Sequence, residues 1–151
     1  MPGLLVVHHT PSPGTHTLLE AVLEGAATPE VAGVETVVRP ALQASATDVL
    51  GADGYLLGTP ANLGYISGAL KHFFDVVYYP VLGATRGRPF GCWIHGDDDT
   101  GGATAAVTRI ATGLAWKPIR PVLELTGRPD GHAREQCQEL GAVMAATLAE
   151  V

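Results

Sequence analysis

Three segments of this chain combine hydroxyl, histidine and glycine residues in the manner of ligand-binding loops. The first runs from His8 to Thr17 and leads into an apolar helical pattern. Hydroxyl side chains and the unpaired amides at a helix start can together bind phosphate without a basic side chain. Gly14 permits close approach of the backbone, whereas Pro11 and Pro13 each remove an amide donor. The segment predicts a phosphate-binding loop, and the alternative is an ordinary capped strand-to-helix loop.

The second segment, Gly58–Asp75, joins a short strand to a helix. The apolar run 55–57 lies between two glycines and predicts a buried strand. A helix is predicted from Ser67, because an apolar stripe follows at helical spacing: Leu70, Phe73, Phe74, Val77 and Tyr78. Residues 59–66 are then expected to form a loop, in which Pro60 restricts the backbone. A loop held in this way suits a flat ligand.

The third segment, His95–Ala103, follows another predicted strand and contains three successive aspartates, 97–99. Adjacent carboxylates converge poorly on one ion, so we expect a solvated acidic loop and no metal site. Thr100 or Asp99 is expected to cap the helix that follows.

Histidines at the ends of predicted strands raise the question of acid/base or metal chemistry. His8 and His9 are successive residues whose side chains point to opposite faces, so they cannot easily share one ion. At least one of them is expected to be a hydrogen-bonded structural histidine. His95 is better placed to relay a proton to a bound ligand, and a purely structural role is the alternative.

The elements that must position these segments alternate along the chain. Strands are predicted at 4–7, 34–38, 55–57, 90–94 and 122–125. Helical patterns lie between and after them, including a short helix at 47–50 with Ser45 or Thr47 as its N-cap. Such alternation predicts one domain over residues 1–151 with a five-stranded parallel sheet buried on both faces, in the order 2-1-3-4-5. The carboxyl ends of the first and third strands should then meet at the switch point, where such sheets bind ligands.

The run Gly58–Asp75 resembles the second flavin loop of the flavodoxin-like superfamily, and is most similar to the NAD(P)H-dependent FMN and quinone reductases. The shared features are Gly-Thr-Pro, then Ser-Gly, then an amphipathic Leu-Lys-x-Phe-x-Asp helix. The resemblance implies an α/β three-layer sandwich that binds FMN at the three loops. It places the phosphate on the first loop, the ring on the second and the ring edges on the third. The candidate cofactor-binding residues are Thr10, Ser12, Gly14, Thr15, His16, Thr17, Pro60, Ala61, Asn62, Leu63, Gly64, Tyr65, His95, Gly96, Gly101 and Gly102, with His95 also the candidate catalytic residue.

Each part of this assignment has a structural alternative. Asn62, Leu63 and Tyr65 are expected to contact the ring, with Leu63 covering one face. Their alternative role is turn chemistry with an aromatic packed against the next helix. The first loop lacks the Thr-Gly-Asn-Thr run usual for the superfamily.

Composition and missing motifs exclude several function classes. The 151-residue chain is 46% hydrophobic and 16% charged, which indicates a globular protein. A net charge of −6 argues against nucleic acid or an anionic membrane as partner, and no apolar run is long enough to span a bilayer. We expect no signal peptide at Met1, and two cysteines without a metal or redox motif favour the cytoplasm. Nucleotide-binding, esterase and zinc-protease motifs are absent, and Thr59 stands where a response regulator needs its phospho-acceptor carboxylate.

The leading functional hypothesis is an FMN-dependent oxidoreductase that passes electrons from NADH or NADPH to a quinone, a flavin or a similar small acceptor. The alternatives are a flavodoxin-type electron carrier that docks to larger partners, and a flavodoxin-fold module that has lost FMN. The apolar and aromatic run Val76–Leu82 exceeds what one inward stripe needs, so a homodimer around this helix is also expected.

Overall fold

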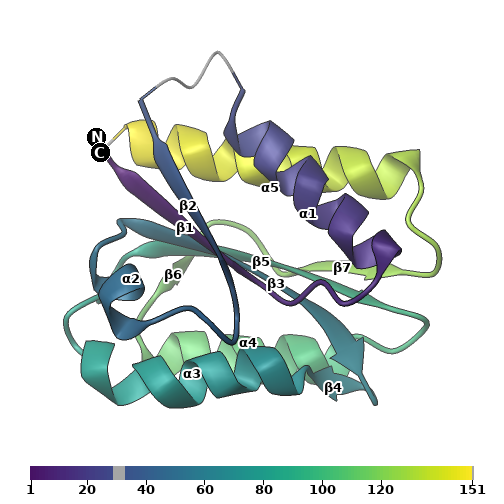
Figure 1. Ribbon diagram of the computed structural model, residues 1–151, viewed down its shortest axis with the longest axis horizontal. Coiled ribbons are helices and arrows are strands. Elements are labelled where there is room, and N and C mark those ends of the chain that lie inside the picture. Colours follow the sequence, from purple (N-terminus) through teal and green to yellow (C-terminus); the bar gives the residue numbers. More distant parts are fainter. Residues whose placement is uncertain (29–32, 151) are drawn as a thin grey trace.

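The computed structural model describes residues 1–28 and 33–150 as a seven-stranded sheet between helices (Figure 1). Its strands are β1 Gly3–His8, β2 Glu35–Pro40, β3 Gly54–Asn62, β4 Tyr65–Ile66, β5 Pro89–Gly96, β6 Lys117–Pro118 and β7 Leu123–Thr126. Its helices are α1 Pro13–Ala26, α2 Ala46–Leu50, α3 Gly68–Val81, α4 Gly101–Gly113 and α5 Gly131–Ala149. Among the residues described, no helix has the length and apolar composition needed to cross a bilayer.

The central sheet is parallel and has the order β2-β1-β3-β5-β6, with β7 also paired to β5. This confirms the predicted order 2-1-3-4-5, with β5 as the fourth strand and β6 and β7 together as the fifth. The fifth strand is interrupted at Pro121: the amides of Lys117 and Ile119 donate to carbonyls at the start of β5, and Pro121, the next residue in that alternation, has no N–H to donate.

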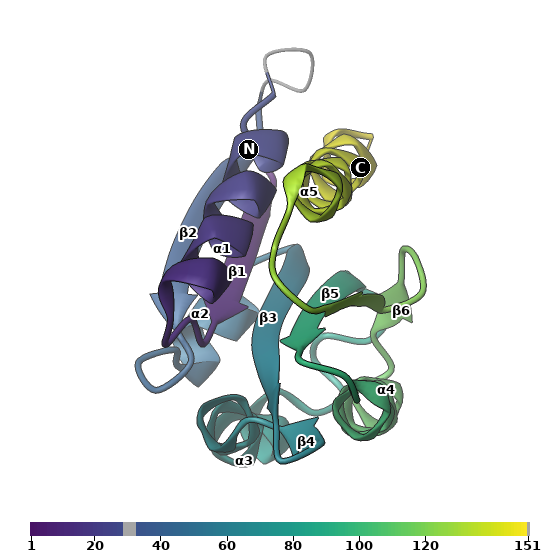
Figure 2. The same ribbon diagram turned by 90° about the vertical axis from the view of Figure 1, so that its right-hand side faces the viewer.

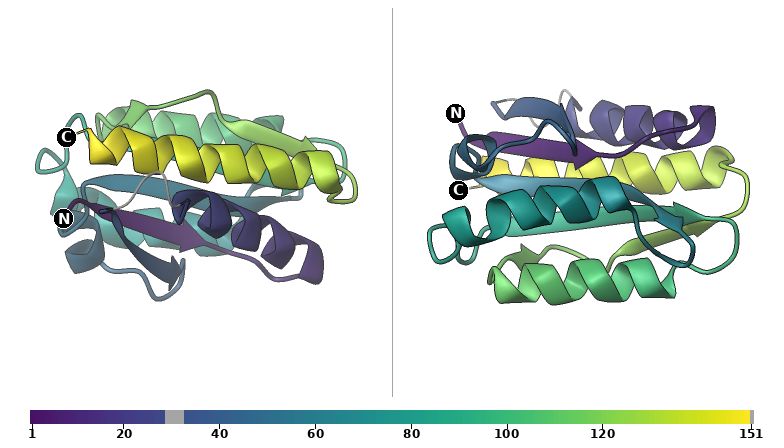
Figure 3. Two further views of the ribbon diagram at one scale, coloured as in Figure 1. Left: turned by 90° about the horizontal axis from the view of Figure 1, so that it is seen from above. Right: turned by 60° about the horizontal axis from the view of Figure 1, so that its bottom comes forward.

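Helices cover the sheet on both faces (Figures 2 and 3). Helices α1 and α5 lie side by side on one face, whereas α2, α3 and α4 cover the other. Side chains of β1 alternate between the two layers: Leu4 and Val6 pack under α1 and α5, and Leu5 and Val7 pack under the opposite helices. The predicted three-layer α/β sandwich is therefore confirmed.

One predicted boundary is wrong. Residues 59–66, expected to be a loop, continue β3 as far as Asn62 and then fold back as β4, which pairs antiparallel with β3. The strand continues because β5 still offers it a partner: Thr59 pairs with Ile94 and Pro60 with His95. The segment is thus a β-hairpin, which we call the tip hairpin (residues 59–66), projecting beyond the sheet.

Candidate functional site

The carboxyl ends of β1, β3 and β5 bring the three predicted loops together. His8 pairs with Gly58, and Pro60 pairs with His95, so the chain leaves the sheet at neighbouring positions on all three strands. The amide of His9 also donates to the Gly58 carbonyl at 2.9 Å, which ties the first loop to β3. The strand tips therefore form one contiguous edge, as the topology predicted.

In the first loop, Ser12 starts helix α1 with a capping box. The Thr15 amide donates to Ser12 Oγ at 3.2 Å, and the Ser12 amide donates to Thr15 Oγ1 at 3.1 Å. Thr17 is bonded to the Pro13 carbonyl at 3.0 Å, and Thr10 Oγ1 lies 3.1 Å from His8 Nδ1. The predicted phosphate-binding hydroxyls are thus held in fixed positions by the loop itself.

Two amides of this loop remain available. In the part of the chain that the structure describes, no hydrogen bond engages the backbone N–H of Thr10 or of Gly14. Gly14 N–H lies in the first turn of α1, where the helix dipole favours an anion. The first loop therefore retains the free donors that a phosphate group needs.

The segment after β7 packs against the first loop. A Cβ built on Gly14 would lie 3.3 Å from Cγ of Pro129, which follows β7.

Burial lowers the pKa of His8 at the base of the loop, and the nearby His16 and His9 lower it further. His16 itself is exposed and its Nε2 lies 2.9 Å from Glu20 of the next helical turn.

The second loop is fixed at its base and exposed at its tip. Buried Thr59 lies 2.8 Å from the hydroxyl of Ser67, which in turn caps α3 by accepting from the Leu70 amide at 3.2 Å. Beyond this base, Leu63 and Gly64 form the turn of the tip hairpin with φ values of 53° and 71°. Leu63 is fully exposed, whereas the Tyr65 side chain is 54% exposed. Apolar surface on a rigid hairpin beside the strand tips is suited to contact with a planar ring.

The third loop is closed by the segment after β7. His95 Nε2 lies 2.5 Å from the Gly127 carbonyl, and the Gly127 amide donates to the Gly96 carbonyl at 3.0 Å. Because a carbonyl only accepts, this contact assigns the proton of a neutral His95 to Nε2 and leaves Nδ1 as the acceptor.

Helix α4 begins at this loop, directly beneath the tip hairpin. Of the two predicted caps, Thr100 occupies the N-cap position of α4 but makes no capping bond with its side chain, whereas Asp99 Oδ1, one residue earlier, accepts from the Gly101 amide at 3.1 Å. A Cβ on Gly102 would lie 2.0 Å from the Gly64 carbonyl. Gly102 therefore allows α4 to touch the hairpin, and its predicted contact with a cofactor stays a prediction.

Sequence reasoning missed three contacts that hold the site. These are the Thr59–Ser67 hydrogen bond, the packing of Gly58 on the Trp93 ring and the closure of β5 by the Gly127 turn. The Gly-Thr-Pro and Ser-Gly pattern signals the first contact, whereas the other two need the fold. Within residues 1–28 and 33–150, no group of three His, Cys, Asp or Glu side chains is placed to hold a metal ion.

Taken together, the residues at the strand tips fit a phosphorylated planar cofactor. The free amides at the start of α1 suit the phosphate, and the exposed Leu63 and Tyr65 suit the ring. At the end of β5, Gly96 packs closely against β3, because a Cβ there would lie 3.3 Å from that of Ala61.

Comparison with known proteins agrees with this fold. A flavodoxin of Aquifex aeolicus (strain VF5) is 36% identical over 88 residues, which cover 58% of this chain and 46% of that protein. The chain therefore aligns with about half the length of that relative. Two solved structures resemble the whole chain. A flavodoxin from the domain Archaea has 16% sequence identity and a TM-score of 0.83, and the match covers 97% of this chain and 98% of that one. A WrbA-like flavodoxin from Agrobacterium tumefaciens has 18% identity and a TM-score of 0.78, and the match covers 99% of each chain.

The two structural matches establish a flavodoxin-like fold, since their sequence identities are low. The family match extends over residues 13–123, which include the tip hairpin and the third loop; it begins within the first loop, after Thr10 and Ser12. By that match, the chain belongs to the NADPH-dependent FMN reductase family.

Proposed function

We propose that this chain binds FMN at the three strand tips and uses it to pass electrons from NADH or NADPH to a small acceptor such as a quinone or a free flavin. The observation that carries the proposal is the convergence of the three loops. Strand register places the α1 amides, the tip hairpin and His95 along one edge of the sheet. Family membership supports FMN as the ligand of that edge.

The first loop would hold the phosphate. The free amides of Thr10 and Gly14 would donate to the anion, that of Gly14 from the positive end of α1, and the hydroxyls of Ser12 and Thr15 lie in the same loop. Pro11 and Pro13 supply no donors but fix the path of the backbone. This arrangement needs no lysine or arginine in the loop.

The tip hairpin and the third loop would hold the ring. Leu63 and Tyr65 offer apolar contact from the hairpin, and Asn62 offers an amide to the polar edge. His95 Nδ1 is the nitrogen left to accept a proton at the β5 tip, because Nε2 faces the Gly127 carbonyl. FMN, when bound, supplies the redox chemistry, and the chain orients it and excludes water.

A second candidate function, a flavodoxin-type electron carrier, has specific support. The Aquifex relative is itself a flavodoxin, and the acidic run 97–99 lies next to the exposed hairpin, where a basic protein partner would dock. A module without FMN is the third candidate, because two prolines occupy the phosphate loop. The NADPH-dependent family match favours the enzyme.

Self-association through α3 belongs to the same proposal. Val76, Tyr79 and Leu82 are 45%, 80% and 46% exposed toward the C-terminal end of this helix, which leaves an apolar surface at the end of α3 that points away from the tip hairpin. We propose a homodimer around this surface, which we call the α3 surface.

Buried thiols at Cys92 and Cys137 suit the reducing cytoplasm, the proposed location.

Absorbance spectroscopy separates the three candidates. Protein incubated with FMN and freed of excess ligand should be yellow, and anaerobic addition of NADH or NADPH should bleach the bound flavin within a turnover time. Retention of FMN without bleaching by either nicotinamide would favour the electron carrier. A protein that is colourless after incubation with saturating FMN and removal of the excess would leave only the module without a cofactor.

A further inference from the structure

Strand β2 forms one margin of the sheet and presents an open edge (Figure 2). It pairs only with β1 in the described part of the chain, and four of its six residues are exposed. The short helix α2, of five residues, follows it in the chain. An open edge of this kind is a template for pairing with another strand.

The hydrogen bonds at either end of β2 show which residues face outward. The amide of Glu35 donates to the Pro2 carbonyl at 2.9 Å, and that of Ala41 donates to the His8 carbonyl at 2.8 Å. Odd-numbered residues therefore point their backbone groups toward β1. By the alternation of a strand, Thr36 and Val38 point theirs outward. Pro40 also faces outward but has no N–H to donate.

We propose that β2 pairs antiparallel with β2 of a second copy of this chain, with the two Val37 residues opposite each other. Outward-facing residues must oppose outward-facing residues, which leaves few registers. Centring the pair on Val37 sets Thr36 against Val38 of the second copy, and Val38 against Thr36. All outward amides are then used, whereas a shift toward Pro40 loses donors.

The side chains of the strand favour the same register. With Val37 at the centre, Glu35 lies opposite Arg39 of the second copy, and Arg39 lies opposite Glu35. Opposite charges at facing positions stabilise an antiparallel pair, and the two-fold symmetry makes this pair occur twice. The strand is therefore complementary to itself in charge as well as in hydrogen bonding.

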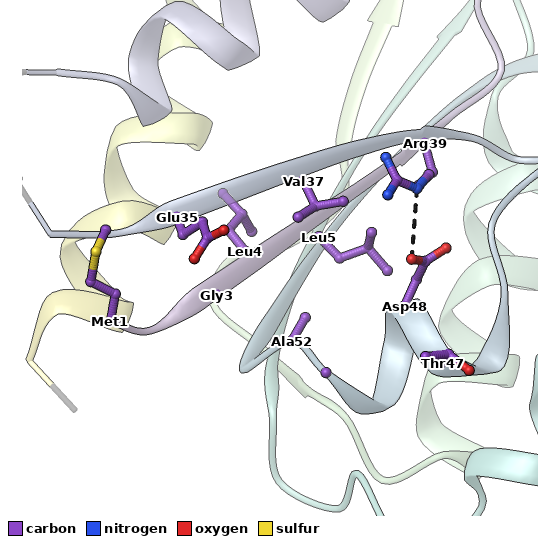
Figure 4. A pocket seen from close by; sticks show the side chains of 11 residues that line it. Met1, Gly3, Leu4, Leu5, Glu35, Val37, Arg39, Thr47, Asp48 and Ala52 are labelled. Carbon is purple, nitrogen blue, oxygen red and sulfur yellow. Dashed lines mark ion pairs between the residues drawn. The ribbon is translucent and has the colours of Figure 1, made fainter.

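Figure 4 shows the face of the sheet on which these side chains lie. Glu35, Val37 and Arg39 border a cavity of about 250 Å³ between β1, β2 and α2. Buried Leu5 and Ala52 form part of its wall. In the paired strands, two such cavities would meet along the central Val37 residues and close off apolar surface from water.

In the single chain, the Arg39 side chain is hydrogen-bonded to a backbone carbonyl of the open edge. Its Nη1 donates to the Val38 carbonyl at 3.2 Å, and its Nε lies 3.6 Å from Asp48 Oδ1, while its side chain is 45% exposed. Pairing requires Arg39 to leave that carbonyl and turn toward Glu35 of the second copy. A short edge of this size predicts a weak, concentration-dependent contact. It uses neither the strand tips nor the α3 surface, so it is independent of the proposed function.

Disulfide trapping tests the register directly. Facing residues at a non-hydrogen-bonded position lie about 4.5 Å apart, so Val37→Cys should cross-link to its own copy under mild oxidation. Thr36→Cys is the matched control, because its two copies would lie more than about 7 Å apart in this register. Thr36 is exposed and Val37 is partly buried, so random collision would favour the control. Native Cys92 and Cys137 are buried.

Charge reversal tests the ion pairs in the Val37→Cys background. Glu35→Arg or Arg39→Glu alone sets like charges opposite each other and should slow cross-linking about tenfold. The double reversal restores opposite charges and should recover the rate. Thermal unfolding of each variant checks that the fold is kept. Equal cross-linking of Val37→Cys and Thr36→Cys, or no recovery in the double reversal, would overturn the proposal.

Discussion

The hydroxyl groups of Thr59 and Ser67 lie 2.8 Å apart and join the end of β3 to the start of α3. Both residues are buried, and Ser67 is wholly inaccessible. Because Ser67 Oγ also accepts from the Leu70 amide, one pair of side chains fixes the base of the tip hairpin and the direction of the helix. This contact gives a physical reason for the Gly-Thr-Pro and Ser-Gly pattern, which positions Leu63 and Tyr65 beside the strand tips.

Replacing Ser67 by alanine should lower the free energy of unfolding by about 1–2 kcal/mol, because the helix loses its cap and buried Thr59 loses a partner. Ser45→Ala is the matched control, since Ser45 Oγ accepts from the Asp48 amide at 3.2 Å at a less buried site on a shorter helix. Urea unfolding followed by circular dichroism measures both. A smaller loss for Ser67→Ala than for Ser45→Ala would show that the buried contact is not important.

The ring of Trp93 leaves no room for a side chain at position 58. A Cβ at position 58 would lie 2.1 Å from the indole, which is itself buried in the core under α1 and α5. Gly58→Ala should therefore destabilise the protein by about 2 kcal/mol or more. Gly131→Ala is the control, because nothing lies within 4 Å of a Cβ there and the site is the first residue of α5. Similar melting temperatures for the two variants would contradict this packing.

Leu63 combines strain with exposure, which is typical of a functional position. Its φ of 53° disfavours a side chain, and it is fully exposed. Leu63→Gly should raise the free energy of unfolding by up to about 1 kcal/mol while weakening FMN binding several-fold. Ala115, with φ of 59° between α4 and β6, is the control: Ala115→Gly should relieve similar strain and leave FMN affinity unchanged. Unaltered FMN affinity in Leu63→Gly would remove the hairpin from the site.

The sequence predicted the sheet order because each strand is a short apolar run followed by a helical stripe, and crossover handedness leaves few topologies. The prediction was wrong at the end of β3, because the apolar run ends before residue 58 but the strand continues to Asn62. Whether Thr59 and Pro60 continue the strand depends on pairing with β5, which is tertiary information. The same applies to the fifth strand, which was predicted at 122–125 only, without the separate β6 and the break between β6 and β7.

For the site, the sequence predicted which loops meet but not what each side chain contacts. The hydroxyls of the first loop could be identified by composition, whereas their capping bonds to one another depend on the path set by the prolines. The partner of His95 lies on the turn after β7, 32 residues away, so no local pattern reveals it.

His8 makes stability depend on pH. Burial first, and then the charges of His16 and His9, lower its pKa below the ordinary value of 6.5. The unfolded chain therefore takes up the proton at higher pH than the folded one. Stability should be constant above about pH 6.5, fall as the pH drops toward the folded pKa, and level off below it. His8→Gln should flatten this decline in urea unfolding, whereas replacing the exposed His72 by glutamine should not. If the free energy of unfolding of His8→Gln still fell with pH as steeply as that of the parent protein, His8 would not be the cause of the decline.

The most direct test of FMN binding at the strand tips is an amide chemical-shift titration with FMN, and with riboflavin as the ligand that lacks phosphate. FMN should shift the amides of the first loop, the tip hairpin and the β5 tip, with Thr10 and Gly14 among the largest changes. Riboflavin should shift the hairpin and leave Thr10 and Gly14 nearly unmoved. Saturating FMN that shifts none of these amides, or only those of β2 around the cavity, would contradict the proposed site.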